Sequence, residues 1–133
     1  MKYTLNLTKS ARRHLIAADV LAPTDRIDVA GYLYGIAAEC AVKAMMIRAG
    51  IKQLSPSKRR EDPYFLHFPQ LQTVLRDRLK GRVSGPLSHV ISNSSFMDKW
   101  STEMRYSSGK EIKRDWIKKW AQQALQSVNS MDT

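Results

Sequence analysis

The sequence is poor in the residues that most often hold metal ions or form covalent cross-links. It contains a single cysteine, Cys40, which excludes an internal disulfide and a zinc site built from several thiolates. The three histidines, at positions 14, 67 and 89, have no carboxylate or second histidine at a helical ligand spacing. We therefore expect no metal site and no cofactor, and we expect Cys40 to be a buried, unreactive thiol.

Signature loops and uncharged apolar spans are also missing. The chain has no glycine-rich phosphate-binding loop and no nucleophile elbow, which argues against a kinase or hydrolase of a standard type. Its first residues contain no apolar segment of signal-peptide type. The most apolar stretch, residues 29–47, carries Glu39 and Lys43 near its centre, where a charge in a membrane costs roughly 2.5–3.5 kcal/mol. We therefore expect a cytoplasmic protein that makes no membrane contact.

Acidic residues are few relative to basic ones. Twenty-two Lys and Arg face twelve Asp and Glu, which gives a net charge of +10 and an isoelectric point near 10.0. Such a charge attracts polyanions such as nucleic acid, nucleotides or an acidic protein. Hydrophobic residues at 43% and charged residues at 26% are ordinary for a folded protein. The length of 133 residues fits one domain, so we expect residues 1–133 to form a single unit.

Apolar residues recur at helical spacing in five segments, and no strand pattern competes with them. Thr8 is predicted to cap the first helix after an extended lead-in, and Asp28 is predicted to cap the second. The tail from Asn129 is expected to fray. The expected helices cover residues 8–22, 29–47, 69–79, 87–100 and 111–128. The predicted fold class is all-α, a four- to five-helix up-and-down bundle with short connections.

The second segment, residues 29–47, is predicted to be the central helix. Gly31 and Gly35 are expected to let another backbone approach closely, since each glycine costs a helix about 1 kcal/mol relative to alanine. Glu39 and Lys43 are four residues apart, and an exposed pair at this spacing contributes about 0.2–0.5 kcal/mol. If they are buried, each needs a partner or a ligand, so an ion pair and a binding role both stay open. The predicted apolar seam is Val29, Leu33, Ile36, Cys40, Ala44 and Ile47.

A second candidate site follows Trp100. Arg105 and Tyr106, with the hydroxyls of Ser107 and Ser108, are suited to hold a phosphate or a base just before a helix. In the alternative interpretation Trp100 and Tyr106 fill the core. Arg105 then pairs with a nearby carboxylate, that of Glu103, Asp98 or Glu39.

Two basic segments suit contact with a phosphate backbone, which depends strongly on salt and needs no base reading. One is the loop that contains Lys58, Arg59 and Arg60, and the other is the cationic face of the last helix, with Lys113 and Arg114. The alternative is that both are simply solvated surface.

Taken together, these pieces resemble the HEPN family, the higher-eukaryote and prokaryote nucleotide-binding domains. The similarity covers most of the chain, from SARRHLIAADVL through YLYGIAAECAVKAMMIRAGI and HFPQLQTVL to WSTEMRYSSG before the last helix. The second helix of the family carries small residues, an acid and a downstream lysine, matched here by Gly35, Ala38, Glu39 and Lys43. Its Arg-Tyr step before the last helix is matched by Arg105 and Tyr106.

The resemblance implies a helical bundle that forms a homodimer. Some family members are metal-independent ribonuclease toxins that use an Arg and a His separated by four to six residues. Others lack that motif and act as nucleotide- or RNA-associated domains beside a small nucleotidyltransferase. Two pairs here have the ribonuclease spacing, Arg82 with His89 and Arg60 with His67. Prolines interrupt both pairs, and no histidine follows Arg105.

We therefore expect a non-catalytic domain that binds a nucleotide or RNA and works with a nucleotidyltransferase partner in a toxin-antitoxin or defence-type module. In this hypothesis Glu39, Lys43, Arg105 and Tyr106 converge to line one site, and the basic loop and the last helix supply the positive field. The first alternative is a metal-independent ribonuclease that uses one of the two Arg/His pairs. The second alternative is a helical oligomerisation module whose basic face binds an acidic protein.

Overall fold

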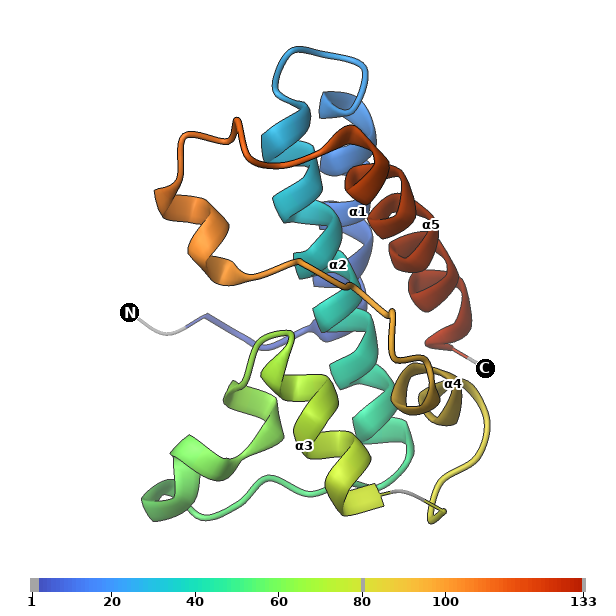
Figure 1. Cartoon of the computed structure of the whole chain (residues 1–133). Helices are drawn as coiled ribbons and strands as arrows, with labels where there is room; N and C mark the ends of the chain where they lie inside the picture. Colours follow the sequence, from blue (N-terminus) through green and yellow to red (C-terminus); the bar gives the residue numbers. More distant parts are fainter. Residues whose placement is uncertain (1–2, 80, 133) are drawn as a thin grey trace.

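The computed structural model describes residues 3–79 and 81–132. Within these residues the chain forms five α-helices and three short 3-10 helices, with no strand, so the all-α prediction is confirmed (Figure 1). The α-helices are α1 (Leu7–Leu21), α2 (Ile27–Arg48), α3 (Gln70–Leu79), α4 (Pro86–Ser92) and α5 (Arg114–Ser130). The 3-10 helices are η1 (Pro56–Glu61), η2 (Pro63–Phe65) and η3 (Thr102–Tyr106). None of the described helices is long and apolar enough to cross a membrane.

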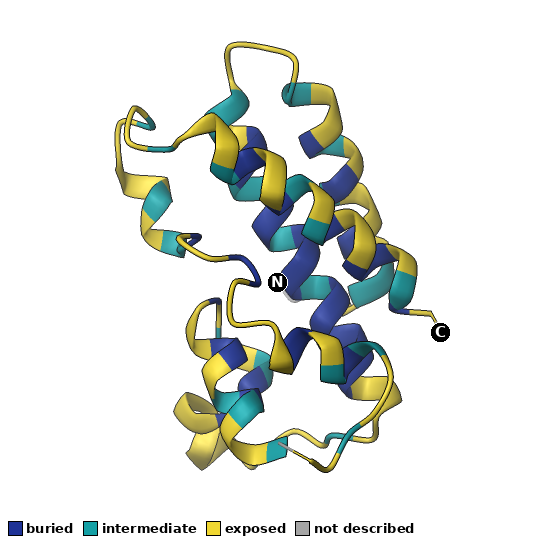
Figure 2. Ribbon diagram, turned by 45° about the vertical axis from the view of Figure 1, so that its right-hand side comes forward, coloured by how far each residue is buried: buried dark blue, intermediate teal, exposed yellow. Residues whose placement is uncertain are grey.

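Helix α2 is the axis of the molecule. Helices α1 and α5 pack along its N-terminal part and on each other, whereas α3 and α4 pack together near its C-terminal end (Figure 1). Figure 2 shows that buried residues concentrate on α2 and on the faces that other helices turn toward it. Because neighbours surround α2 on several sides, burial extends from Ala30 to Met46.

The most buried face of α2 differs from the predicted seam. Val29 and Ile47 of that seam are 39% and 53% exposed, and Cys40 is half-buried. Most of the fully buried side chains of α2 are small, because two helices approach each other most closely where the side chains between them are short. The fully buried apolar residues of α2 are Ala30, Ala37, Ala38, Ala41, Val42 and Met46.

The glycines of α2 are contacted by side chains, not by another backbone as predicted. A Cβ atom added at Gly35 would overlap the indole ring of Trp100. A Cβ atom at Gly31 would lie 3.1 Å from Ile117 and Trp120 of α5. The indole Nε1 of Trp100 donates to the carbonyl oxygens of Gly31 (3.2 Å) and Tyr32 (3.3 Å). The missing side chains therefore make room for two tryptophans.

Both predicted helix caps were misplaced. The side chain of Asn6, not Thr8, accepts a hydrogen bond from the backbone N–H of Lys9 at the start of α1. At α2 the cap position is Arg26, and Asp28 lies within the first turn. An acid in the first turn still complements the positive end of the helix dipole.

The later connections are longer than predicted. Helix α4 ends at Ser92, where Asn93 adopts an extended conformation. The helix does not resume before Trp100, and Met97 and Lys99 have positive φ angles of 51° and 69° that a right-handed helix does not contain. Helix α5 starts at Arg114, and it continues past the predicted fraying point at Asn129. Met131 after it is 1% exposed, so this side chain is packed into the core.

Candidate functional site

Two charged side chains are buried in the middle of α2. Glu39 and Lys43 are 6% and 7% exposed, and the Lys43 ammonium donates to Glu39 Oε2 at 3.1 Å. Their spacing places them one turn apart on one face of the helix. Burial of an ion pair is costly unless the remaining lone pairs and protons are also satisfied. A single ion pair leaves the second oxygen of Glu39 in need of a partner.

His67 supplies that partner. Its Nδ1 lies 2.9 Å from Glu39 Oε1, across 28 positions of sequence. Because an ionised carboxylate can only accept a hydrogen bond, Nδ1 carries the proton in this contact. The His67 side chain is 48% exposed. A neutral His67 therefore keeps Nε2 as a free acceptor, held in a defined orientation by a buried carboxylate.

The segment before His67 is shaped by Asp62. This carboxylate is fully buried and accepts hydrogen bonds from the backbone N–H groups of Leu54 (2.9 Å) and Tyr64 (3.0 Å). Directly after His67, Phe68 is 2% exposed and packs edge-on against Phe96 and Trp100. The turn held by Asp62 before His67 and the buried ring of Phe68 after it together keep His67 against α2.

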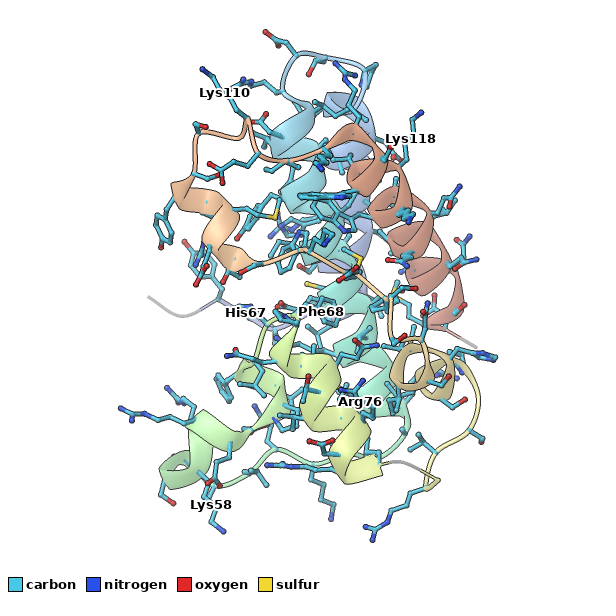
Figure 3. All side chains as sticks on the ribbon, in the orientation of Figure 1. Lys58, His67, Phe68, Arg76, Lys110 and Lys118 are labelled. Carbon is cyan, nitrogen blue, oxygen red and sulfur yellow. The ribbon has the colours of Figure 1, made fainter. Side chains whose placement is uncertain are left out.

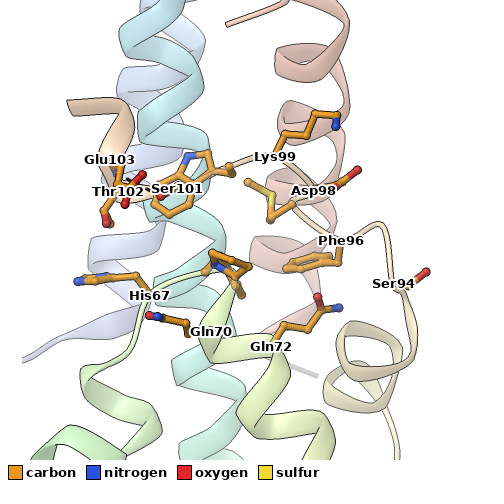
Figure 4. Close-up of a pocket in the computed structure, with 14 residues that line it drawn as sticks. His67, Gln70, Gln72, Ser94, Phe96, Asp98, Lys99, Ser101, Thr102 and Glu103 are labelled. Atoms are coloured by element: carbon orange, nitrogen blue, oxygen red, sulfur yellow. Dashed lines mark hydrogen bonds between the residues drawn. The ribbon is translucent and has the colours of Figure 1, made fainter. Parts of the chain in front are cut away.

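His67 lines a cleft of about 530 Å³ between the start of α3 and the segment that leads into η3 (Figure 4). His67 and Gln70 come from one side of this cleft, and Ser101, Thr102 and Glu103 come from the other. Sequence reasoning missed Gln70, Ser101 and Thr102. The available signal was their position next to the large apolar residues Phe68 and Trp100, which anchor both walls.

Arg105 and Tyr106 lie on η3 beyond the cleft wall, and both are exposed. Arg105 Nε donates to the carbonyl oxygen of Thr102 at 3.0 Å, and its guanidinium lies 5.3 Å from the ring centroid of Tyr106. Tyr106 is 82% exposed and so does not fill the core, whereas Trp100 does. Among the described residues, both oxygens of Glu39 are hydrogen-bonded by Lys43 and His67, and Arg105 makes neither contact.

The other candidate residues are spread over the surface. Arg60 is exposed on η1, Arg82 is exposed in the turn between α3 and α4, and His89 is exposed on α4. The basic residues of η1 and those at the start of α5 lie at opposite ends of the molecule, as the positions of Lys58 and Lys110 in Figure 3 indicate. The structure therefore separates the two basic segments. These exposed basic residues are Lys58, Arg59, Arg60, Lys113 and Arg114.

The thiol next to Glu39 is a poor nucleophile. Burial raises the pKa of Cys40 and outweighs the lowering by the hydrogen bond with Ser10; the Glu39 carboxylate adds a smaller rise, and Lys43 and Arg13 lower the pKa slightly. No group of three or more His, Cys, Asp or Glu that could hold a metal ion occurs in the described parts of the chain. The chemistry available at the cleft is therefore that of an oriented imidazole, hydroxyls and amides, together with the charged side chains of Asp98, Lys99 and Glu103.

The fold and this cleft define the protein as an all-α domain in which a buried Glu39–Lys43 pair holds a half-exposed His67. Comparisons with protein-family models, with curated proteins and with solved structures found no match to the chain.

Proposed function

We propose that this chain is a HEPN-like domain that binds RNA or a nucleotide. In this proposal it is non-catalytic, cytoplasmic and homodimeric, and it works with a small nucleotidyltransferase in a toxin-antitoxin or defence-type module. The observation that carries the proposal is the buried Glu39 carboxylate, which holds His67 at the edge of a 530 Å³ cleft in a chain of net charge +10.

The charge of the chain supports a polyanionic ligand, and the cleft supports a specific one. A net charge of +10 attracts RNA without selecting a sequence. The cleft adds hydrogen-bonding groups next to a buried aromatic floor, an arrangement that suits the hydroxyls and bases of a single strand. Arg105 and Tyr106 are exposed beyond it, where an aromatic ring and a guanidinium can stack on a further base.

Titration of the purified chain with fluorescent RNA and with mononucleotides at two salt concentrations tests this function. We expect binding at low salt that weakens steeply at high salt. Arg105→Ala with Tyr106→Ala should weaken RNA binding, whereas a control substitution in the exposed turn between α1 and α2, Asp25→Ala, should not. A chain that binds neither RNA nor nucleotides at low salt contradicts the proposal.

One observation favours a second function, a metal-independent ribonuclease. A histidine whose Nδ1 donates to a buried carboxylate is oriented for proton transfer through Nε2. In such a reaction His67 would take the proton of the attacking 2′-hydroxyl or give one to the leaving oxygen, with a cation such as Arg60 stabilising the charge on phosphorus. The contact with Glu39 favours His67 over His89, which is exposed on α4.

Cleavage of RNA in the presence of a chelator distinguishes the two functions. If His67 is a general acid or base, His67→Ala lowers the cleavage rate by roughly 10²–10⁴-fold. His89→Ala serves as the matched control and should retain activity. Cleavage that survives both substitutions contradicts a His-based ribonuclease, and a folded wild-type chain that binds RNA without cutting it supports the non-catalytic function.

A further inference from the structure

A second hollow lies beside the Glu39–Lys43 pair and shares no lining residue with the cleft at His67. It is a groove of about 340 Å³, within the size range of small-molecule sites. Its walls are apolar and partly open to solvent, with Leu5, Ile47 and Phe65 exposed by 71%, 53% and 46%. The remaining wall includes Ile51 and the ring of Tyr64, whose hydroxyl donates to the carbonyl oxygen of Ile51.

Of the residues that the structure describes, Lys43 is the one charged residue that lines this groove. An ammonium group has three N–H donors, and in the described part of the chain its one hydrogen bond goes to Glu39. Two donors of a buried cation are therefore unmatched by protein groups, which is unfavourable unless a ligand or water accepts from them. An occupant of the groove should present acceptors to Lys43 and an apolar surface to the walls.

The rim of the groove carries a second cation. The guanidinium of Arg59, in the middle of the exposed basic segment Lys58–Arg60, lies 4.7 Å from the ring centroid of Phe65. A ligand that combines a flat ring with an anionic group would place the ring between the apolar walls and the anion near Arg59. Nucleotides have this combination, and stacking of a base on an aromatic ring or a guanidinium is favourable.

We propose that the groove binds the base of a guanine nucleotide, with Lys43 as the residue that reads the base. Guanine presents two adjacent acceptors, O6 and N7, and lysine is a common partner for them. Adenine replaces O6 with an amino donor, which would face the donors of Lys43 and be rejected. This inference rests on the proposed function and names the nucleotide class that it would take.

Equilibrium binding of GMP, IMP and AMP to the full chain tests the proposal. The three ligands carry the same phosphate, and IMP keeps O6 and N7 of guanine without its 2-amino group. We expect GMP and IMP to bind alike and at least tenfold more tightly than AMP. Backbone amide shifts in the wild-type NMR spectrum should move at Leu5, Ile47 and Ile51 when GMP is added. Equal affinity for GMP and AMP overturns the assignment.

Two variants test the groove in different ways. Lys43→Met should abolish the preference for GMP over AMP, whereas Lys118→Met on the exposed side of α5 removes the same charge and should preserve it (Figure 3). Ile47→Trp fills the groove from a half-exposed position and should weaken GMP at least tenfold without disturbing the buried pair. Circular dichroism verifies the fold of each variant. Unchanged GMP affinity in Ile47→Trp overturns the proposal even if Lys43→Met does not fold.

The outcomes separate this inference from the function on which it rests. If RNA binds at low salt but GMP and AMP do not differ, the guanine site is wrong and the RNA-associated function stands. If neither RNA nor any nucleotide binds, both are wrong.

Discussion

Glu39 is a buried acid whose two oxygen atoms have separate tasks. Oε2 accepts from Lys43 one turn along α2, and Oε1 accepts from His67 on a distant segment. Burial of a charge in the core is expensive, and a salt bridge alone seldom offsets it. The buried Glu39 carboxylate also orients the exposed imidazole of His67 at the edge of the cleft.

Gly35 offers the sharpest stability test at this scale. Gly35→Ala gains about 1 kcal/mol of helix propensity, but its methyl group would overlap the buried indole of Trp100. Overpacking of a core costs typically about 1–3 kcal/mol and more where nothing can move. We expect a lower free energy of unfolding in urea denaturation. Gly31→Ala, which meets its neighbours at 3.1 Å, is the control and should change stability by less than about 1 kcal/mol. A more stable Gly35→Ala would contradict this packing.

Cys40 gives a prediction that depends on pH. Burial and the adjacent Glu39 raise the pKa of the thiol, so the reactive thiolate is scarcer in the folded chain than in the unfolded one. Iodoacetamide at pH 8 should therefore label the native protein more slowly than the protein in urea, and the native rate should still rise above the ordinary thiol pKa. The stabilisation from the neutral thiol is present below the unfolded pKa and is lost as the pH rises through the raised value. Equal labelling rates in the two states would contradict the raised pKa.

At the scale of elements, α2 organises the molecule because it has two different kinds of neighbour. Helices α1 and α5 pack on its N-terminal part, where alanine and glycine allow close approach. The segment from η2 to α3 brings His67 to its middle, and the groove with Lys43 lies beside it. The cleft and the groove are therefore linked to the same turn of α2, the cleft through the His67–Glu39 contact and the groove through Lys43.

The start of α1 supplies an element-scale prediction. Asn6 accepts from the N–H of Lys9 at 3.1 Å and so satisfies one of the free donors of the first turn. Asn6→Ala should lower the free energy of unfolding by about 0.5–2 kcal/mol, the range for a lost N-cap. Thr8→Ala is the comparison and should cost less, since the Thr8 hydroxyl donates to Asn6 Oδ1 at 3.2 Å and makes no cap bond to the backbone in the described chain. A larger loss of unfolding free energy in Thr8→Ala than in Asn6→Ala would indicate that Thr8, the cap predicted from the sequence, is the real start of the helix.

At the scale of the whole molecule, positive charge gathers in two places that the fold keeps apart. The η1 segment and the start of α5 lie at opposite ends of the molecule (Figure 3). Only η1 is continuous in sequence with the turn that carries His67. A short RNA strand that enters the cleft meets Lys99 in the cleft wall, and of the two basic segments we expect η1, rather than α5, to add further phosphate contacts.

This difference predicts a salt dependence. The variant in which Lys58, Arg59 and Arg60 are all changed to glutamine should bind a short single strand with a weaker salt dependence. The slope of log Kobs against log salt should become shallower by about 2, because each of the three phosphate contacts contributes about 0.7. The same change at Lys113, Arg114 and Lys118 should leave the slope for that strand unchanged. Fluorescence anisotropy at four salt concentrations measures both. A larger effect from the α5 set would place the RNA at the other end of the molecule.

The sequence alone determined the properties that arise locally along the chain. Helical periodicity specified an all-α fold and a central helix over residues 29–47, because a 3.6-residue repeat is visible within a single segment. The charge at Glu39 and Lys43 and their spacing were also visible, and so was the net charge of +10.

Tertiary structure alone decided what those residues contact. The pairing of Glu39 with His67 depends on the path of 27 intervening residues, and that path is set by the buried Asp62 and Phe68 rather than by any periodic pattern. The same holds for Trp100, which reaches Gly35 after a turn through two residues of positive φ. Contacts between distant segments depend on the path of the loops between them, and the local spacing of residues does not determine that path.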